Sequence, residues 1–394
     1  MTRLRTEAAA LLPELTALRR DLHREPEIGL DLPLTQRKVL DALDGLPLEI
    51  TLGQATTSVT AVLRGGHPGP VVLLRGDMDG LPVAEETGLD YAGTNGNMHA
   101  CGHDLHTAGL VGAAKLLAAR ADEIHGSVVF MFQPGEEGYK GAKVMLDEGL
   151  LDVAGQRPIA AYGIHVAPGP RGTFSIKSGP ALAGSNTLEI TVTGKGGHGS
   201  QPQTAVDPVP ALLAIASELQ TMVTRRFSVF DPVVLSVTQL QAGEAINVIP
   251  AQASLGATVR TLSPESVETM RTETTRLAAG IASAHGCTAE VDFEVQYPVT
   301  VNTPEQTDWV AAELRGLFGE ERIEIVDQPL MGSEDFSFVL EEVPGTFFFL
   351  HCSPDGLDPA TAAWNHSPHV LFDDAVLADE AAALAHLALT RLAG

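Results

Sequence analysis

Four short runs of apolar residues stand out along the chain, and each is bounded by glycine or proline. They cover residues 71–74, 128–132, 159–164 and 346–350. None of them alternates between apolar and polar positions, as a strand with one face in water would. Continuous apolar runs of this length are typical of strands that are covered on both faces. The pattern therefore predicts a mostly parallel central sheet flanked by helices.

Helical periodicity appears around and between these runs. Leucines recur at positions 11, 15, 18 and 22, and this pattern breaks near Pro26. Residues 107–119 place Leu110, Ala113 and Leu117 on one helix face, and the alanine-rich residues 375–393 predict a C-terminal helix. Strand, helix and strand in this order indicate the α/β class.

The middle third of the chain has a different pattern. Leu188, Ile190 and Val192 alternate with polar residues, which predicts a strand with one solvated face. There follow a helix at 208–224, strands at 233–240 and 253–262, a helix from 264 to about 284 and a strand at 288–295. This order, βαββαβ, is that of a ferredoxin-like unit. We therefore predict an inserted α+β domain at 182–295, between two parts of an α/β domain at 1–181 and 296–394.

Charge and cysteine content narrow the class of protein. The 394 residues include 50 acidic and 25 basic ones, which gives a formal net charge of −25. Because phosphate groups attract cationic surfaces, this balance argues against nucleic acids and anionic membranes as partners. Cys101, Cys287 and Cys352 are too scattered to predict a disulfide framework. With neither an apolar membrane span nor a signal peptide in evidence, we expect a cytoplasmic protein.

Polar residues follow the predicted strands at their carboxyl ends. Asp77 and Asp79 come after the first apolar run, Glu136 and Glu137 come after the second, and His165 ends the third. In open parallel sheets, ligands bind where the carboxyl ends of the strands converge. We therefore expect these side chains to share one site.

Cys101 and His103 lie in the loop ahead of the helix predicted at 107–119. Gly102 between them permits a tight turn, so both side chains can reach one ion. Alone, such a pair more often indicates a structural thiol beside a helix-capping histidine. Together with His165 and the carboxylates it favours a metal site. Thiolate, imidazole and carboxylate suit Zn²⁺, with Mn²⁺, Co²⁺ or Ni²⁺ as alternatives.

The adjacent carboxylates Glu136 and Glu137 can divide two tasks. One is neutralised on a metal, and the other stays available as a base. The alternative is an ordinary solvated loop, although the pair follows a strand predicted to be buried. For Asp77 and Asp79 we expect an orienting role behind the metal ligands, with a charged turn as the alternative. For His106, a packing or orienting role is favoured over a ligand role.

Residues 194–199 fit the pattern G-x-G-x-x-G, which binds dinucleotides when a helix begins at its third glycine. Here Ser200, Gln201 and Pro202 follow instead. The dinucleotide interpretation lacks its required helix, and we discard it.

Eight motifs in a fixed order resemble those of a known family. They are RGDMDGLP at 75–82, MHACGHD at 98–104, QPGEE at 133–137, GIH at 163–165, GKGGH at 194–198, NVIP at 247–250, GSEDF at 332–336 and HSP at 366–368. The chain resembles the dinuclear metal amidohydrolases of the aminoacylase/carboxypeptidase family over nearly its whole length. The most similar branch contains hippurate hydrolases, N-acyl-amino-acid amidohydrolases, N-acetyl-diaminopimelate deacetylase and plant auxin-conjugate hydrolases.

The resemblance implies metal-dependent hydrolysis of the amide bond of N-acyl amino acids, such as hippurate-like or N-acetyl conjugates, to carboxylic acid and free amino acid. It implies that two divalent metal ions are held by Cys101, His103, Glu137, His165 and His366. Cys101 stands where relatives outside this branch carry a bridging aspartate. Glu136 would be the general base, and Asp79 would orient the metal centre.

The resemblance also makes the inserted domain a lid and dimerisation domain, so we expect a homodimer or homotetramer. His198 would polarise the scissile carbonyl, and Asn247 and Arg260 would contact the substrate's carboxylate or carbonyl. A surface salt bridge is the alternative for Arg260. The chain departs from the family pattern at Gly80, at Gly135 and at residues 199–200, where small apolar residues are commoner after the histidine.

Three alternative functions stay open. The first is a dipeptidase or carboxypeptidase on the same scaffold. The second is a catalytically decayed metal-binding sensor, against which stands the presence of every ligand position and of the base. The third is a thiol redox enzyme using Cys101, although no C-x-x-C partner is present.

Overall fold

The computed structural model describes residues 3–358 and 361–393. The chain divides into two compact units: unit 1 holds residues 1–181, 301–328 and 335–394, and unit 2 holds residues 182–300 and 329–334. The insertion predicted at 182–295 thus falls within unit 2, which is somewhat larger. The last long strand of unit 2 continues to Tyr297. Residues 329–334 belong to unit 2 as well, and the Ala183 N–H donates to the Leu330 carbonyl there (3.0 Å).

Unit 1 is built on an eight-stranded sheet in the order β1-β2-β4-β3-β5-β16-β6-β15. The four predicted apolar runs form its parallel centre, which consists of β4 (His125–Gln133), β3 (His67–Asp77), β5 (Ala160–Ala167) and β16 (Gly345–His351). Three pairs are antiparallel: β1 (Leu48–Leu52) with β2 (Val59–Arg64), β2 with β4, and β6 (Phe174–Ile176) with β16. At the other edge, β15 (Ile323–Ile325) runs parallel to β6. The predicted mostly parallel sheet is confirmed.

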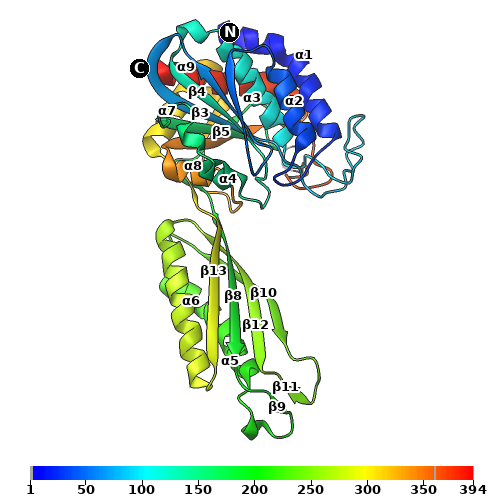
Figure 1. Ribbon diagram of the computed structural model, residues 1–394, viewed down its shortest axis with the longest axis vertical. Helices are drawn as coiled ribbons and strands as arrows, with labels where there is room; N and C mark the ends of the chain where they lie inside the picture. Colours follow the sequence, from blue (N-terminus) through cyan, green and yellow to red (C-terminus); the bar gives the residue numbers. More distant parts are fainter. Residues whose placement is uncertain (1–2, 359–360, 394) are drawn as a thin grey trace. The chain divides into compact units, whose positions relative to one another are not determined.

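Helices cover both faces of this sheet (Figure 1). On one side lie α1 (Arg3–Arg24), α2 (Pro33–Leu43), α3 (His103–Ala118) and α9 (Leu377–Leu392), and on the other lie α4 (Gly141–Asp147) and α8 (Ser337–Glu342). A further helix, α7 (Pro304–Phe318), packs against β16 and α9. The predicted N-terminal and C-terminal helices are thus confirmed as α1 and α9.

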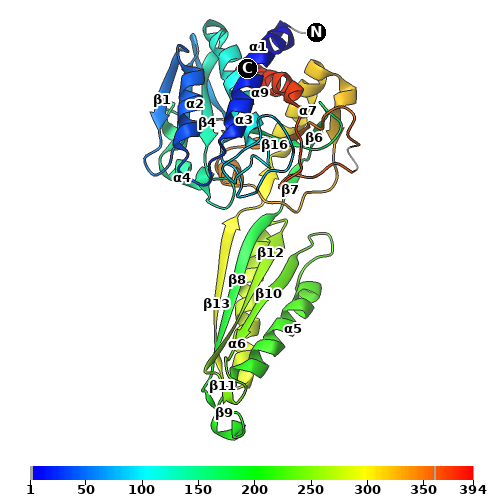
Figure 2. The same cartoon turned by 90° about the vertical axis from the view of Figure 1, so that its right-hand side faces the viewer.

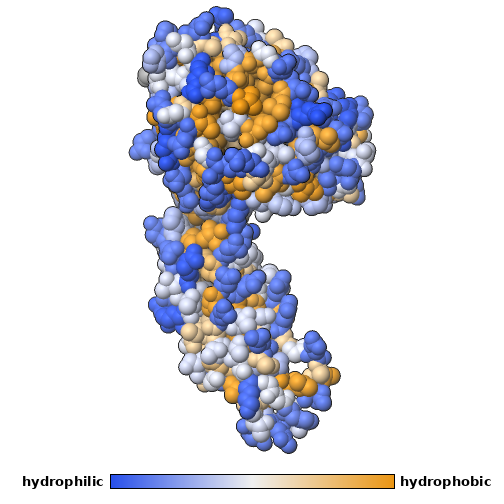
Figure 3. Space-filling model, viewed as in Figure 1, coloured by the Kyte–Doolittle hydropathy of each residue, from blue (hydrophilic) through white to orange (hydrophobic). Residues whose placement is uncertain are grey.

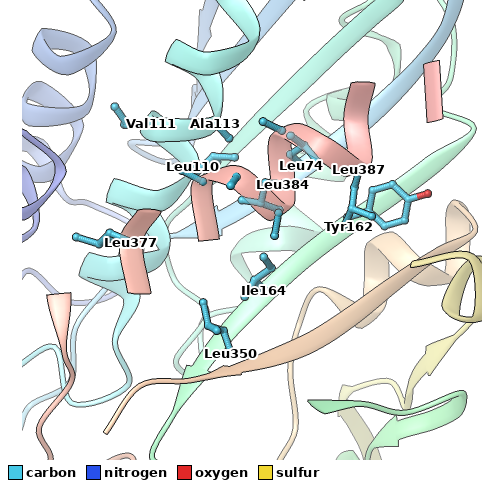
Figure 4. Packing of buried hydrophobic residues seen from close by; sticks show 14 of the residues in the cluster. Leu74, Leu110, Val111, Ala113, Tyr162, Ile164, Leu350, Leu377, Leu384 and Leu387 are labelled. Carbon is cyan, nitrogen blue, oxygen red and sulfur yellow. The ribbon is translucent and has the colours of Figure 1, made fainter. Parts of the chain in front are cut away.

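The centre of unit 1 is the packing of α3 and α9 on the sheet. Figure 4 shows Leu110 of α3, Leu384 of α9, Leu74 of β3 and Ile164 of β5 within one cluster of buried hydrophobic residues. All four side chains are buried, and each contributes about 1.5–3 kcal/mol relative to an exposed side chain. This core fixes the start of α3 and the carboxyl ends of the central strands relative to one another.

Unit 2 contains a four-stranded antiparallel sheet in the order β10-β12-β8-β13 (Figure 2). Its elements follow the predicted order βαββαβ: β8 (Gly184–Thr193), α5 (Pro208–Arg226), β10 (Val234–Ala242), β12 (Gln252–Thr261), α6 (Pro264–Ala284) and β13 (Thr288–Tyr297). Buried and exposed residues alternate along β8 and β12, since the helices cover only one face. The ferredoxin-like prediction is confirmed.

A small two-stranded ladder of β9 (Gly197–His198) and β11 (Val248–Ile249) extends unit 2. Strand β9 is followed in the chain by a short 3₁₀ helix, Pro202–Thr204. No α-helix begins at Gly199, the third glycine of the G-x-G-x-x-G pattern. The remaining strands, β7 (Gly179–Leu182) and β14 (Thr300–Asn302), lie where the chain passes between the units.

Blue hydrophilic residues occupy much of the visible surface of each unit, interrupted by smaller orange hydrophobic areas (Figure 3). Within residues 3–358 and 361–393, every helix is too short or too polar to span a bilayer.

Candidate metal centre

The register of the central strands brings the predicted carboxylates together. Asp77, the last residue of β3, pairs with Gln133, the last residue of β4, so the turns after both strands begin side by side. The Asp79 carboxylate then accepts the backbone N–H groups of Glu136 and Glu137, each at 3.0 Å. Asp79 thus holds the turn that carries both glutamates.

The turn between Cys101 and His103 depends on glycine. Gly102 has φ +83°, and a Cβ at this position would lie 2.3 Å from Cγ2 of Val166, so no other residue fits without strain. Helix α3 begins at His103, four residues earlier than predicted, which corrects the placement of His103 in a loop. Gly102 forms the N-cap, and Asp104 places a negative charge at the positive end of the helix dipole.

Two groups of possible metal donors meet at Cys101. Its Sγ lies 3.4 Å from Nε2 of His165 and 3.3 Å from Nε2 of His366. One group consists of Cys101, His103 and His165, and within it all donor atoms lie within 4.8 Å of one another. The second group, equally close, consists of Cys101, Glu137 and His366. Four side chains, those of His103, Glu137, His165 and His366, therefore gather around the Cys101 thiol.

The donor set fits divalent metal ions. Nδ1 of His165 donates to the Val166 carbonyl (2.8 Å), which leaves the lone pair of Nε2 directed toward Cys101. His103 is fully buried, and neither of its ring nitrogens makes a hydrogen bond to a described residue, although Nδ1 lies 3.3 Å from Oδ1 of Asp79. Burying an imidazole without hydrogen bonds costs free energy, which metal coordination would offset.

Negative charge around the cluster changes the proton affinity of its histidines. Hydrogen bonds from His366 to Cys101 and Glu137 raise the pKa of His366 to about 10. Burial alone would lower the pKa of His103, but Asp77, Asp79 and Cys101 outweigh burial and raise that pKa. Burial and nearby His106 instead lower the pKa of His165. A cation at this place would interact with the same negative groups.

His106 has no nitrogen available for an ion. Its Nε2 accepts the N–H of Val166 (2.7 Å), so Nδ1 carries the proton and donates to Oδ1 of Asp77 (2.5 Å). Arg75 lies 2.6 Å from the other oxygen of Asp77. His106 is therefore held between Asp77 and the Val166 backbone, and the orienting role expected for His106 and Asp77 stays a prediction.

Asn365 belongs to the site but was not predicted. Its Nδ2 donates to the carbonyls of Val166 (3.1 Å) and Cys101 (3.3 Å). The next residue, His366, has φ +71°, unusual for a residue other than glycine, and its N–H donates to the Ala100 carbonyl (2.8 Å). The position of Asn365 beside a predicted ligand was the available signal.

His23 was also left without a role, and the structure buries it in a charged network. Its Nδ1 lies 2.7 Å from Asp104 and its Nε2 lies 3.2 Å from Glu85. Arg19, one helical turn earlier on α1, contacts the same Asp104 oxygen at 2.7 Å. The network ties α1 to the residue that directly follows His103.

In unit 2, the structure brings two of the three predicted substrate contacts together. His198 pairs with Val248 across the β9–β11 ladder, and the Gly199 N–H donates to the Asn247 carbonyl (2.8 Å). Strand β12 begins at Gln252, next to this ladder, and Arg260 lies eight residues further along the strand. At ~3.3 Å per residue this separates Arg260 from the ladder by about 26 Å.

Arg260 forms no ion pair with a described acidic residue, so the surface salt bridge considered as its alternative is absent there. Its guanidinium instead donates to the Thr258 hydroxyl (2.9 Å) and to the Val259 carbonyl. Burial lowers the pKa of Arg260.

Comparison with known proteins places the chain in a family. Residues 73–390 match the description Peptidase family M20/M25/M40. The chain is 37% identical to N-acetylcysteine deacetylase of Bacillus subtilis, over 92% of this chain and 93% of that protein. It is 35% identical to hippurate hydrolase of Campylobacter jejuni, over 98% of both. It is also 35% identical to thermostable carboxypeptidase 1 of Saccharolobus solfataricus, over 98% and 97%.

A solved structure agrees with these relatives. A dinuclear metal-binding peptidase of the M20 family from Bacillus subtilis matches with a TM-score of 0.83 at 33% identity, over 98% of this chain and 99% of that one. The fold and the donor cluster define a metal-dependent amidohydrolase. The chain belongs to peptidase family M20/M25/M40, and the resemblance inferred from its motifs is confirmed.

Proposed function

We propose that this protein hydrolyses the amide bond of N-acyl amino acids and releases a carboxylic acid and a free amino acid. The observation that carries the proposal is the meeting of two donor groups at Cys101, beside the Glu136-Glu137 turn. The names of two relatives, N-acetylcysteine deacetylase and hippurate hydrolase, support this class of substrate.

In this proposal Cys101, His103 and His165 would hold one divalent ion, and Cys101, Glu137 and His366 would hold another. Bound ions would supply Lewis-acid activation of the scissile carbonyl and of a water molecule. Zinc suits these donors, with manganese, cobalt and nickel as alternatives.

Glu136 is the proposed general base. Its side chain is only 6% exposed, and Asp79 fixes its backbone next to the donor cluster. It would take a proton from the attacking water and pass that proton to the leaving amine. His198 would donate a hydrogen bond to the carbonyl oxygen as negative charge develops there, while Asn247 and Arg260 bind the substrate's polar groups.

The proposal includes a second copy of the chain. His198 and Arg260 lie near opposite ends of one sheet, about 26 Å apart along β12, which is much longer than an N-acyl amino acid. If both contact one substrate, they must come from different copies, as in a homodimer or homotetramer formed through unit 2. We also propose a cytoplasmic location, since a reducing compartment preserves the Cys101 thiolate.

A carboxypeptidase or dipeptidase on the same scaffold is the second candidate, favoured by the carboxypeptidase relative. The test is a screen of metal-reconstituted protein against N-acetyl, N-benzoyl and longer N-acyl amino acids, with unblocked dipeptides alongside. We expect the acylated substrates to be hydrolysed faster and chelation to stop the reaction. Faster cleavage of free dipeptides would favour the second candidate. Metal-loaded protein that cleaves neither class would favour a metal-binding sensor.

A further inference from the structure

The ring of His198 is held in a tightly bonded turn of unit 2. Its backbone pairs with β11, the Gly199 N–H donates to the Asn247 carbonyl (2.8 Å), and the Gln201 N–H donates back to the His198 carbonyl (2.8 Å). A Cβ on Gly199 would lie 3.1 Å from the Asn247 backbone. The backbone on both sides of His198 is therefore fixed by hydrogen bonds.

Two donors from Ser200 converge on one nitrogen of this ring. The Ser200 backbone N–H lies 3.1 Å from Nδ1 of His198, and the Ser200 hydroxyl oxygen lies 2.8 Å from the same atom. A backbone N–H can only donate, so Nδ1 must present its lone pair. In the neutral imidazole the proton then resides on Nε2.

We infer that Ser200 is a positioning residue, which holds His198 in the tautomer that carries its proton on Nε2. In this tautomer, Nε2 carries the hydrogen and can donate it to a substrate oxygen. The opposite tautomer would direct a lone pair toward the developing negative charge and repel it. The catalytic part of this inference rests on the proposed function, whereas the tautomer itself does not.

The inference gives a role to the hydroxyl of Ser200. An alanine at position 200 would leave only the backbone N–H facing Nδ1 of His198. In this chain the hydroxyl adds a second hydrogen bond to Nδ1. One net hydrogen bond changes the ratio of two tautomers by about fivefold.

The direct test is nitrogen NMR of protein labelled with ¹⁵N-histidine, because a ring nitrogen with a hydrogen and one with a lone pair resonate far apart. The variant His198→Gln identifies the signals of His198. We expect wild-type Nδ1 to be unprotonated, Ser200→Ala to shift the tautomer ratio by up to about fivefold, and Ser200→Thr to restore it. Thr204→Ala is the matched control, since that hydroxyl donates to the Gln201 carbonyl (2.9 Å) and not to the ring.

A protonated Nδ1 in the neutral wild-type ring would overturn the inference. So would a Ser200→Ala spectrum identical to that of the wild type. These measurements need no substrate, so they decide the inference even if every N-acyl amino acid in the screen is left intact and the proposed function fails.

Kinetics then tests whether the tautomer matters for turnover. We expect Ser200→Ala to lower kcat by up to about fivefold with little change in KM, because only the hydrogen bond made as charge develops is affected. In a variant that already carries His198→Gln, adding Ser200→Ala should not lower kcat any further. An equal loss in both backgrounds would mean that Ser200 acts independently of His198, and would overturn its positioning role.

Discussion

Glu136 and Glu137 are neighbours in the chain, yet the structure gives them different surroundings. Glu137 lies 3.1 Å from Nε2 of His366 within a donor group, whereas Glu136 has its backbone fixed by Asp79. We predict that Glu136→Gln keeps metal binding and lowers kcat by about 10²–10⁴-fold, the usual contribution of a general base. Elemental analysis and steady-state rates check both parts. A variant with wild-type rates would remove Glu136 from the proposed mechanism.

Asn365 donates hydrogen bonds to the carbonyls of Cys101 and Val166, and Val166 and His366 are direct neighbours of His165 and Asn365, respectively. We predict that Asn365→Ala lowers metal affinity about 10–100-fold, the usual cost of losing a group that orients metal ligands. Competition with a chelator measures this affinity. Asn95→Ala is the control, because Asn95 makes a similar bond to the Pro26 carbonyl (2.8 Å) away from the ligands. Equal affinities in both variants would contradict the prediction.

For individual residues, the sequence predicted positions in the fold where a motif followed a clear strand pattern. Cys101, His103, His165 and the glutamates could be placed at one sheet edge because each lies next to a predicted strand or helix. His366 lies in an irregular segment after the last strand, so only the family resemblance singled it out. Asn365 acts through backbone carbonyls distant in sequence, and no local pattern records such bonds.

Among the elements, the start of α3 depends most on one glycine. Gly102 and Gly96 have similar positive φ angles, +83° and +86°, but a side chain at 102 meets Val166 whereas one at 96 meets open space. We predict that Gly102→Ala lowers the free energy of unfolding by about 2–5 kcal/mol, from strain and overpacking together. Gly96→Ala should cost only about 1–2 kcal/mol of strain. Denaturant titration compares the two, and equal costs would contradict the proposed close contact.

The junction of α1 with α3 contains a histidine between two carboxylates. Burial and Arg19 lower the pKa of His23, but Asp104 and Glu85 outweigh them, so the pKa is raised overall. A raised pKa contributes stability that is complete below the unfolded value of ~6.5 and is lost as pH rises through the folded value. The rings that also face His23 are Tyr91 and His99.

We therefore predict that the wild-type melting temperature falls as the pH rises above about 6.5, partly because His23 loses its proton. His23→Gln should be less stable at pH 6 and should show a smaller fall over this range. Thermal melts at several pH values check the slope. A variant with the same slope as the wild type would mean that His23 does not change its charge in this range.

The elements themselves were predicted with uneven success, for physical reasons. Each of the four central strands contains a continuous run of apolar residues because that part of the strand is covered on both faces. Strand β1 is an edge strand whose residues are mostly exposed, and β6 has only three residues, so neither leaves a recognisable pattern. Helix α3 is buried on nearly all sides, and its predicted start was late because the motif residues belong to its first turn.

For the whole molecule, the separation of His198 from Arg260 predicts how copies of the chain cooperate. Each single variant, His198→Ala or Arg260→Ala, should lose most of its activity. A dimer that combines one copy of each still contains one site with an intact Arg260 from one chain and an intact His198 from the other. We predict that co-expression with two different tags, and purification of the mixed dimer, recovers up to about half of the wild-type activity per dimer.

The mixture of separately purified variants under non-exchanging conditions serves as the control and should remain inactive. If the mixed dimer is as inactive as its parents, each substrate is served by one chain alone. Size-exclusion chromatography with light scattering checks in the same samples that the chain is dimeric.

The single sulfur atom common to both donor groups has a consequence for how the enzyme is loaded. If two cations bind to these groups as proposed, the second would meet a thiolate already bound to the first and an adjacent positive charge. The two loading steps should then differ in affinity, with a half-loaded species between them over a range of metal concentrations. If turnover needs both ions, activity would follow the concentration of the more weakly held one.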